Sequence, residues 1–152
     1  MNTLSTKNAS LPGRLLLTVL LWIGWLAQGS AADVTVIVNK DNPTTAMEPA
    51  RVSDLYLGRS RVFPNGEPAH VLEQPRDSLL REQFFRRVNG MSLNQVNTYW
   101  ARLTFSGRVL PPVVQKDSAA ARTAVEADAK AIGYVDEGTL PPSVSPVLGL
   151  HE

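Results

Sequence analysis

Short apolar runs separated by helical patterns organise the chain. Every residue from Val34 to Val38 is β-branched, and the run ends at Asn39 before a polar stretch that contains proline. A continuous run of this kind predicts a strand buried on both faces, as in parallel sheets. Shorter runs predict further strands at residues 69–73 and 132–135, and residues 147–150 form a candidate last strand.

Two helical patterns lie on either side of the strand at residues 69–73. We expect a short helix from Ser53 to Leu57, because the serine hydroxyl can accept a bond from a free N–H of the first turn. A longer helix begins at Asp77 or Ser78 and runs to about residue 88. Its apolar face recurs at every fourth position, at Leu80, Phe84 and Val88.

Two further helices follow in the second half of the chain. Ser92 and Gln95 match the capping-box pattern and precede an apolar stripe that extends to Leu103. After a break at two prolines, the alanine-rich residues 118–130 predict another helix. Strands that alternate with helices indicate an α/β domain with a mostly parallel sheet flanked by helices.

The N-terminus has the layout of a secretory signal. Lys7 and Arg14 precede an apolar run from Leu15 to Ala27, and small residues follow up to Ala32. The apolar run is about a dozen residues long, whereas a membrane-spanning helix needs about 20. We therefore expect residues 1–32 to be a signal peptide that is cleaved near Ala32.

Composition indicates the compartment and excludes some partners. The chain has no cysteine, so the exported domain has neither disulfides nor the cysteine that a bacterial lipoprotein needs. Small exported domains of eukaryotes are often rich in disulfides, so a bacterial periplasm fits better. Loss of the signal leaves 13 basic against 14 acidic residues, which gives no sign of nucleic-acid binding. Residues 33–152 are enough for a single domain with one core.

No catalytic constellation is present in the sequence. There is no cysteine nucleophile, no serine in a nucleophile-elbow pattern and no glycine-rich phosphate loop. The two histidines, His70 and His151, have no metal-ligand partner at a useful spacing. We expect a protein that is not an enzyme and that needs no cofactor or metal.

The start of the helix near residue 78 is the best local signal for a binding site. This helix follows the strand that ends near Glu73, and in open α/β sheets such helix N-termini point free N–H groups at the crevice beyond the strand ends. Asp77 adds negative charge there, which opposes a fully deprotonated ligand. The alternative is an ordinary helix cap with surface arginines. The donors available to an oxyanion are the Ser78 hydroxyl, the N–H groups of Leu79 and Leu80, and the guanidinium of Arg76 or Arg81.

The order of motifs is more specific than any one motif. After the export signal and the strand ending at Asn39 come SDLYLGR at 53–59, FPNG at 63–66, Ser78 followed by REQF at 81–84, YW at 99–100 and AIGYV at 131–135. In this order the chain resembles the periplasmic phosphate-binding proteins of ABC importers, specifically their short, single-lobe members. The resemblance extends from Val34 to about Val135.

The resemblance implies a type 2 periplasmic-binding-protein lobe whose ligand is inorganic phosphate or a related oxyanion. In that family an arginine precedes a Ser-Gly-Thr at the helix start. Ser78 matches the serine, Leu79 and Leu80 replace the glycine and threonine, and Gln74 stands where the arginine is expected. Full-length receptors close two lobes on the ligand, whereas a domain of this size supplies one wall of that cleft.

Two functions therefore remain open at the level of sequence. The first is a periplasmic solute-binding module linked to ABC-type phosphate uptake or sensing, with an ABC permease or another inner-membrane protein as its partner. The alternative is a ligand-free, single-lobe interaction protein in the periplasm. Such a protein would dock on a membrane partner or associate with itself as a homodimer.

Overall fold

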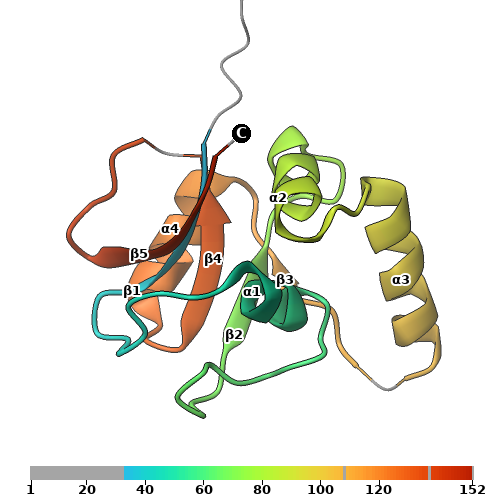
Figure 1. Cartoon of the computed structure of the whole chain (residues 1–152), viewed down its shortest axis with the longest axis horizontal. Helices are drawn as coiled ribbons and strands as arrows, with labels where there is room; N and C mark the ends of the chain where they lie inside the picture. The colour runs from blue at the N-terminus through green and yellow to red at the C-terminus, as the bar shows by residue number, and fades with distance from the viewer. Residues whose placement is uncertain (1–32, 108, 137, 152) are drawn as a thin grey trace, which may run out of the picture.

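The computed structural model describes residues 33–107, 109–136 and 138–151, which form an α/β domain (Figure 1). Its five-stranded sheet has the strand order β3-β2-β4-β1-β5. The strands are β1 (Val34–Asn39), β2 (His70–Glu73), β3 (Val113–Val114), β4 (Ala131–Val135) and β5 (Val144–Leu150). The signal peptide expected at residues 1–32 lies outside the described residues.

The sheet is mostly parallel in the direction of its strands, as predicted, but β1 is the exception. β2 pairs in parallel with β3 and β4, whereas β1 is antiparallel to both β4 and β5. The run from Val34 to Val38 is largely buried, as expected, but the parallel pairing expected for it is wrong. The reason is that a continuous apolar run indicates cover on both faces and carries no information on strand direction.

The described part of the chain has four helices. They are α1 (Pro49–Tyr56), α2 (Leu79–Asn89), α3 (Leu93–Phe105) and α4 (Ser118–Ala127). Of these, α3 packs on α2 and the other three pack on the sheet. Ser78 and Ser92 cap α2 and α3 as the sequence predicts, and the Ser92–Gln95 capping box is formed. Gly90 ends α2 in the left-handed region at a φ of 71°, which glycine adopts without strain.

The predicted limits of two helices are wrong. α1 begins at Pro49, well before Ser53, because proline at the first position is preorganised for a helix. Ser53 is instead buried in the middle of α1, where its hydroxyl accepts a bond of 3.1 Å from Asn89 Nδ2. α4 ends at Ala127 rather than at residue 130, because the Asp128 carboxylate accepts from the Lys130 N–H at 2.9 Å and closes a turn there.

Hydrophobic residues form one cluster on each face of the sheet. The larger cluster joins α1 and α2 to the sheet around Tyr56, Phe84 and Tyr134, and the rings of Phe84 and Tyr134 stack with centroids 3.9 Å apart. The smaller cluster packs α4 on the other face. There the Val125 side chain approaches β4 so closely that a Cβ at Gly133 would lie 3.2 Å from it.

The segment from Asp33 onward contains its own core. Every buried hydrophobic residue of the described part lies between Val34 and Leu150, and the two clusters together connect all four helices to the sheet or to one another. We therefore expect this segment to fold by itself. No helix within the described residues is long and apolar enough to cross a membrane.

Candidate functional site

The N-terminus of α2 lies beyond the carboxyl end of β2, as expected from the sequence. The Ser78 hydroxyl oxygen accepts a bond of 3.2 Å from the Arg81 N–H. The N–H groups of Leu79 and Leu80, at the start of the helix, have no acceptor among the described residues. The Leu79 side chain is exposed and leaves this end of α2 open to solvent.

Arg81 turns inward from the first turn of α2. The residue is only 4% exposed, and its Nε lies 3.2 Å from Glu73 Oε2. Its Nη1 donates to Asn97 Oδ1 at 2.9 Å and to the Arg76 carbonyl oxygen at 3.0 Å. The guanidinium of Arg81 is therefore held by α3, by β2 and by the loop before α2.

Glu73 is the buried carboxylate to which Arg81 is paired. It also accepts hydrogen bonds from the Tyr134 hydroxyl and, at 3.0 Å, from the Gln74 N–H. Burial raises the pKa of Glu73, and the Arg81 charge and the two hydrogen bonds offset part of that rise. Burial, together with the nearby Glu73 charge, raises the pKa of Tyr134 well above its usual range. The Tyr134 hydroxyl consequently keeps its proton and acts as a donor.

Gln74 completes this buried cluster. It is 2% exposed, and its side-chain Nε2 donates to the Tyr134 carbonyl oxygen at 2.8 Å. Gln74 thus joins β2 to β4, at the position where the phosphate-binding proteins that the sequence resembles have an arginine. It takes part in the internal support of the loop before α2.

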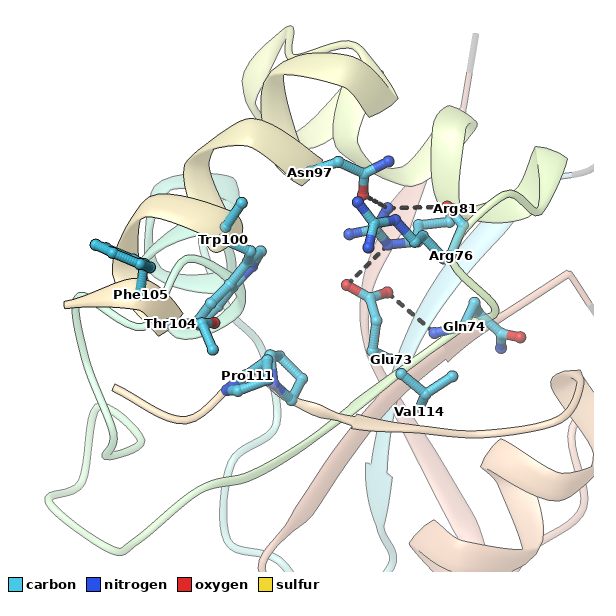
Figure 2. A pocket seen from close by; sticks show the side chains of 12 residues that line it. Glu73, Gln74, Arg76, Arg81, Asn97, Trp100, Thr104, Phe105, Pro111 and Val114 are labelled. Carbon is cyan, nitrogen blue, oxygen red and sulfur yellow. Dashed lines mark hydrogen bonds and ion pairs between the residues drawn. The ribbon is translucent and has the colours of Figure 1, made fainter. Parts of the chain in front are cut away.

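A cavity of about 530 Å³ opens beside this cluster (Figure 2). Its polar end contains Arg76, Arg81 and Asn97, which lie close together in Figure 2, with Glu73 and Gln74 below them. The rest of the wall comes from the second half of α3 and from the segment that leads into β3. Those residues are Trp100, Ala101, Thr104, Phe105, Pro111, Pro112 and Val114.

The structure divides the six predicted site residues into two groups. Arg76 and Arg81 line the cavity, whereas Asp77, Ser78, Leu79 and Leu80 are at the adjoining end of α2 and do not line it. Arg76 and Asp77 are exposed, and neither side chain has a partner among the described residues. Arg76 is therefore the guanidinium at this site that is available to an external anion.

Sequence reasoning did not find Glu73, Asn97, Tyr134 or the apolar wall. A charged residue at the end of an apolar strand is a weak sign of a buried ion pair, so Glu73 carried some signal. Asn97 and Tyr134 join the cluster from α3 and β4, which are remote in sequence, and no local pattern marks them.

Outside this site the structure offers little metal-binding chemistry. Across residues 33–107, 109–136 and 138–151, no three His, Cys, Asp or Glu side chains are grouped so that they would hold a metal ion. His70 forms an exposed pair with Asp128, in which Nδ1 lies 2.6 Å from Oδ2. This contact lowers the pKa of Asp128.

The fold defines the class of protein to which the chain is similar. No protein-family model matches its sequence, and no curated protein does either. Among solved structures, the domain has the fold of ABC transporter substrate-binding proteins, which confirms the α/β architecture implied by the motif order.

Two phosphate receptors illustrate the similarity. One is a phosphate ABC transporter substrate-binding protein with bound phosphate from Clostridium perfringens, with a TM-score of 0.61 and 20% identity over 76% of this chain and 45% of that one. The other is an ABC-type phosphate transport receptor from Vibrio cholerae, with a TM-score of 0.58 and 18% identity over 76% of this chain and 47% of that one. The chain thus spans less than half the length of both receptors.

Proposed function

We propose that the chain is a periplasmic solute-binding module that binds phosphate or a related oxyanion at the N-terminus of α2. The observation that carries this proposal is that the N–H groups of Leu79 and Leu80 at the start of α2, and the guanidinium of Arg76 in the loop just before it, have no partner among the described residues. Free N–H groups and the positive end of a helix favour anions. The fold shared with two phosphate receptors supports the same ligand class.

Each predicted residue has a distinct role in this proposal. Ser78 accepts from the Arg81 N–H and keeps its own hydroxyl proton to donate to the anion. Arg76 supplies the positive charge, and the Asp77 carboxylate accepts the proton of a monohydrogen or dihydrogen oxyanion. Arg81 is a positioning residue, because its side chain fixes the loop before α2 through the Arg76 carbonyl oxygen.

The proposed role follows the resemblance and involves binding without catalysis. After removal of residues 1–32, the module would act in the periplasm in phosphate uptake or sensing, with an ABC permease or another inner-membrane protein as partner. A single open lobe lacks the second set of donors and the exclusion of water that closure provides. We therefore expect affinity in the millimolar range, equivalent to about 4 kcal/mol.

An amide NMR titration of the segment from Asp33 tests the proposal. Phosphate at constant ionic strength should shift the Ser78, Leu79 and Leu80 amides saturably, and sulfate, which carries no proton for Asp77, should shift them less. Arg76→Gln should weaken phosphate binding several-fold. Arg51→Gln makes the same charge change on the exposed surface of α1 and should leave binding unchanged. No shifts at millimolar phosphate would exclude this site.

Exposed apolar side chains favour a second candidate function, that of an interaction protein. Phe105 and Leu110 are 96% and 86% exposed, and Val113 and Val114 on the edge strand β3 are more than half exposed. Exposed apolar patches often mark docking surfaces. This surface would contact a membrane partner or a second copy of the chain.

Sedimentation velocity over a wide range of protein concentration tests this candidate. Self-association should appear as a rise in sedimentation coefficient that Val113→Lys removes, while Val62→Lys, at another exposed valine, leaves it unchanged. A single monomeric species at all concentrations, with no binding to membranes of the producing bacterium, would rule out the interaction role.

A further inference from the structure

We infer that the cavity between α3 and β3 holds the apolar body of an organic phosphoryl compound, a phosphonate or phosphate monoester, whose charged head lies at Arg76. This inference rests on the proposed oxyanion site and specifies its ligand. Inorganic phosphate has no group to occupy the cavity, whereas a phosphoryl head on one aromatic ring or a short alkyl chain would fill both places.

The cavity has the size and the wall of a small-molecule site. Its volume of about 530 Å³ falls within the range of roughly 300–1,000 Å³ that is usual for ligand pockets. Trp100 provides aromatic surface on one side, and Pro111 and Val114 lie on the other (Figure 2). Proline has few conformations to lose, so this part of the wall costs little entropy to order around a ligand.

The polar end of the cavity selects a negatively charged head. Glu73 and Arg81 neutralise each other at 3.2 Å, and the Arg81 guanidinium also holds Asn97. The charge that remains at this end is the positive charge of Arg76, which has no partner among the described residues. Arg76 lies in the loop just before α2, and this residue is the link between the cavity and the proposed oxyanion site.

Trp100 brings a buried donor without an acceptor to the wall of the cavity. The residue is 8% exposed and lines the cavity, yet its indole Nε1 has no hydrogen-bond partner in the structure. A buried donor without an acceptor is costly, and most such groups in native proteins have a partner. The Nε1 atom is itself covered, so an oxygen of the bound compound would become its acceptor once the ring turns toward the cavity.

Trp100 also makes the inference easy to test. The chain contains three tryptophans, and Trp22 and Trp25 precede Asp33, so Trp100 is the sole indole of the segment that contains the core. Its emission should change saturably with phenylphosphonate. We expect phenylphosphonate to bind at least ten times more tightly than methylphosphonate or inorganic phosphate, and benzyl alcohol, which has a ring without the charge, to bind no better than methylphosphonate.

Variants that fill the cavity distinguish its contribution to binding from that of the oxyanion site. Ala101 is an exposed residue of α3 that lines the cavity, so Ala101→Phe should fill it and abolish the tenfold preference, while phosphate still shifts the Leu79 and Leu80 amides. Thr104→Phe is a second filling variant on the same wall. Ala119→Phe makes the same change at an exposed position of α4 and should leave the preference intact.

Results that would overturn the organic ligand differ from results that would overturn the oxyanion site itself. Equal affinity for phenylphosphonate and phosphate, or a preference that survives both filling variants, would overturn the inference and leave the oxyanion site in place. Binding of benzyl alcohol as tight as that of phenylphosphonate would also overturn it, because the head would then contribute nothing. If phosphate shifts no amide of α2 and phenylphosphonate does not bind, the proposed function itself fails.

Discussion

Helices α2 and α3 begin alike, yet the anion site that we propose lies at α2 alone. Each has a serine cap that accepts from the third N–H of the helix. In α3 that third residue is Gln95, whose side chain returns to the Ser92 N–H at 2.8 Å and closes the capping box. In α2 it is Arg81, whose side chain leaves the helix end and enters the buried cluster with Glu73.

The difference shows that a serine cap by itself does not define an anion site. Both helices leave their first N–H groups unpaired, as all helices do. Around α2, however, the buried Arg81 fixes the Arg76 carbonyl oxygen and so holds a second arginine at the mouth of the cavity. What distinguishes α2 is thus the charge that tertiary contacts bring to its N-terminus.

Loss of the Arg81 side chain should have the largest effect. Arg81→Met leaves the buried Glu73 carboxylate without its counter-charge, and breaking a buried pair in this way costs about 3–5 kcal/mol. Urea denaturation would measure the free energy of unfolding. Arg86→Met, on the exposed face of α2, should change it by only about 0.5 kcal/mol.

The double variant Glu73→Leu with Arg81→Met should recover much of that loss, because removal of both charges leaves neither one unpaired. A double variant as unstable as Arg81→Met alone would show that packing, and not the charge pair, makes Arg81 necessary.

The pH dependence of stability should reveal the buried carboxylate. Because the pKa of Glu73 is raised in the folded state, the folded protein binds this proton more tightly than the unfolded chain. Binding of this proton makes its full contribution to the free energy of unfolding below the unfolded pKa of about 4.3. That contribution is lost as pH rises through the pKa of Glu73 in the folded state. Relative to Glu73→Gln, the wild type should lose about 1.4 kcal/mol for each pH unit between the two pKa values.

Urea denaturation of both proteins from pH 4 to pH 8 would measure this difference. A wild type that gains stability relative to Glu73→Gln as pH rises would contradict the direction given for Glu73. It would mean that Arg81 and the hydrogen bonds outweigh desolvation.

The two serine caps should be equal in stability but different in binding. Ser78→Ala and Ser92→Ala should each cost about 1 kcal/mol of unfolding free energy, which is typical for loss of an N-cap. Only Ser78→Ala should also weaken phosphate binding in an NMR titration. Equal phosphate affinity in the two variants would remove Ser78 from the binding site.

A small effect on stability should also come from the first residue of α2. Leu79 is 67% exposed, so Leu79→Gly should cost at most about 1 kcal/mol. The smaller side chain lets an oxyanion approach the helix end, so phosphate should bind several-fold more tightly. Leu93→Gly, at the first position of α3, should leave phosphate binding unchanged. A similar gain in phosphate affinity in both variants would contradict the proposed difference between the two helix N-termini.

The sequence predicts contacts between residues that are close along the chain better than contacts between residues that are far apart. The caps at Ser78 and Ser92 were predictable, because capping involves residues within one turn. The start of α1 was not, since the proline at position 49 outweighed the capping potential of Ser53. The inward course of Arg81 depends on Glu73, Asn97 and Tyr134, which arrive from β2, α3 and β4, and no local pattern contains that information.

An amide NMR titration with phosphate at constant ionic strength tests the central claim most directly, because the segment from Asp33 carries both helix ends. An oxyanion site at α2 should give saturable shifts at Leu79 and Leu80 that are lost in Arg76→Gln, with Leu93 and Asn94 at the start of α3 unchanged. Shifts of equal size at both helix ends, or at neither, would contradict the claim that α2 bears an oxyanion site.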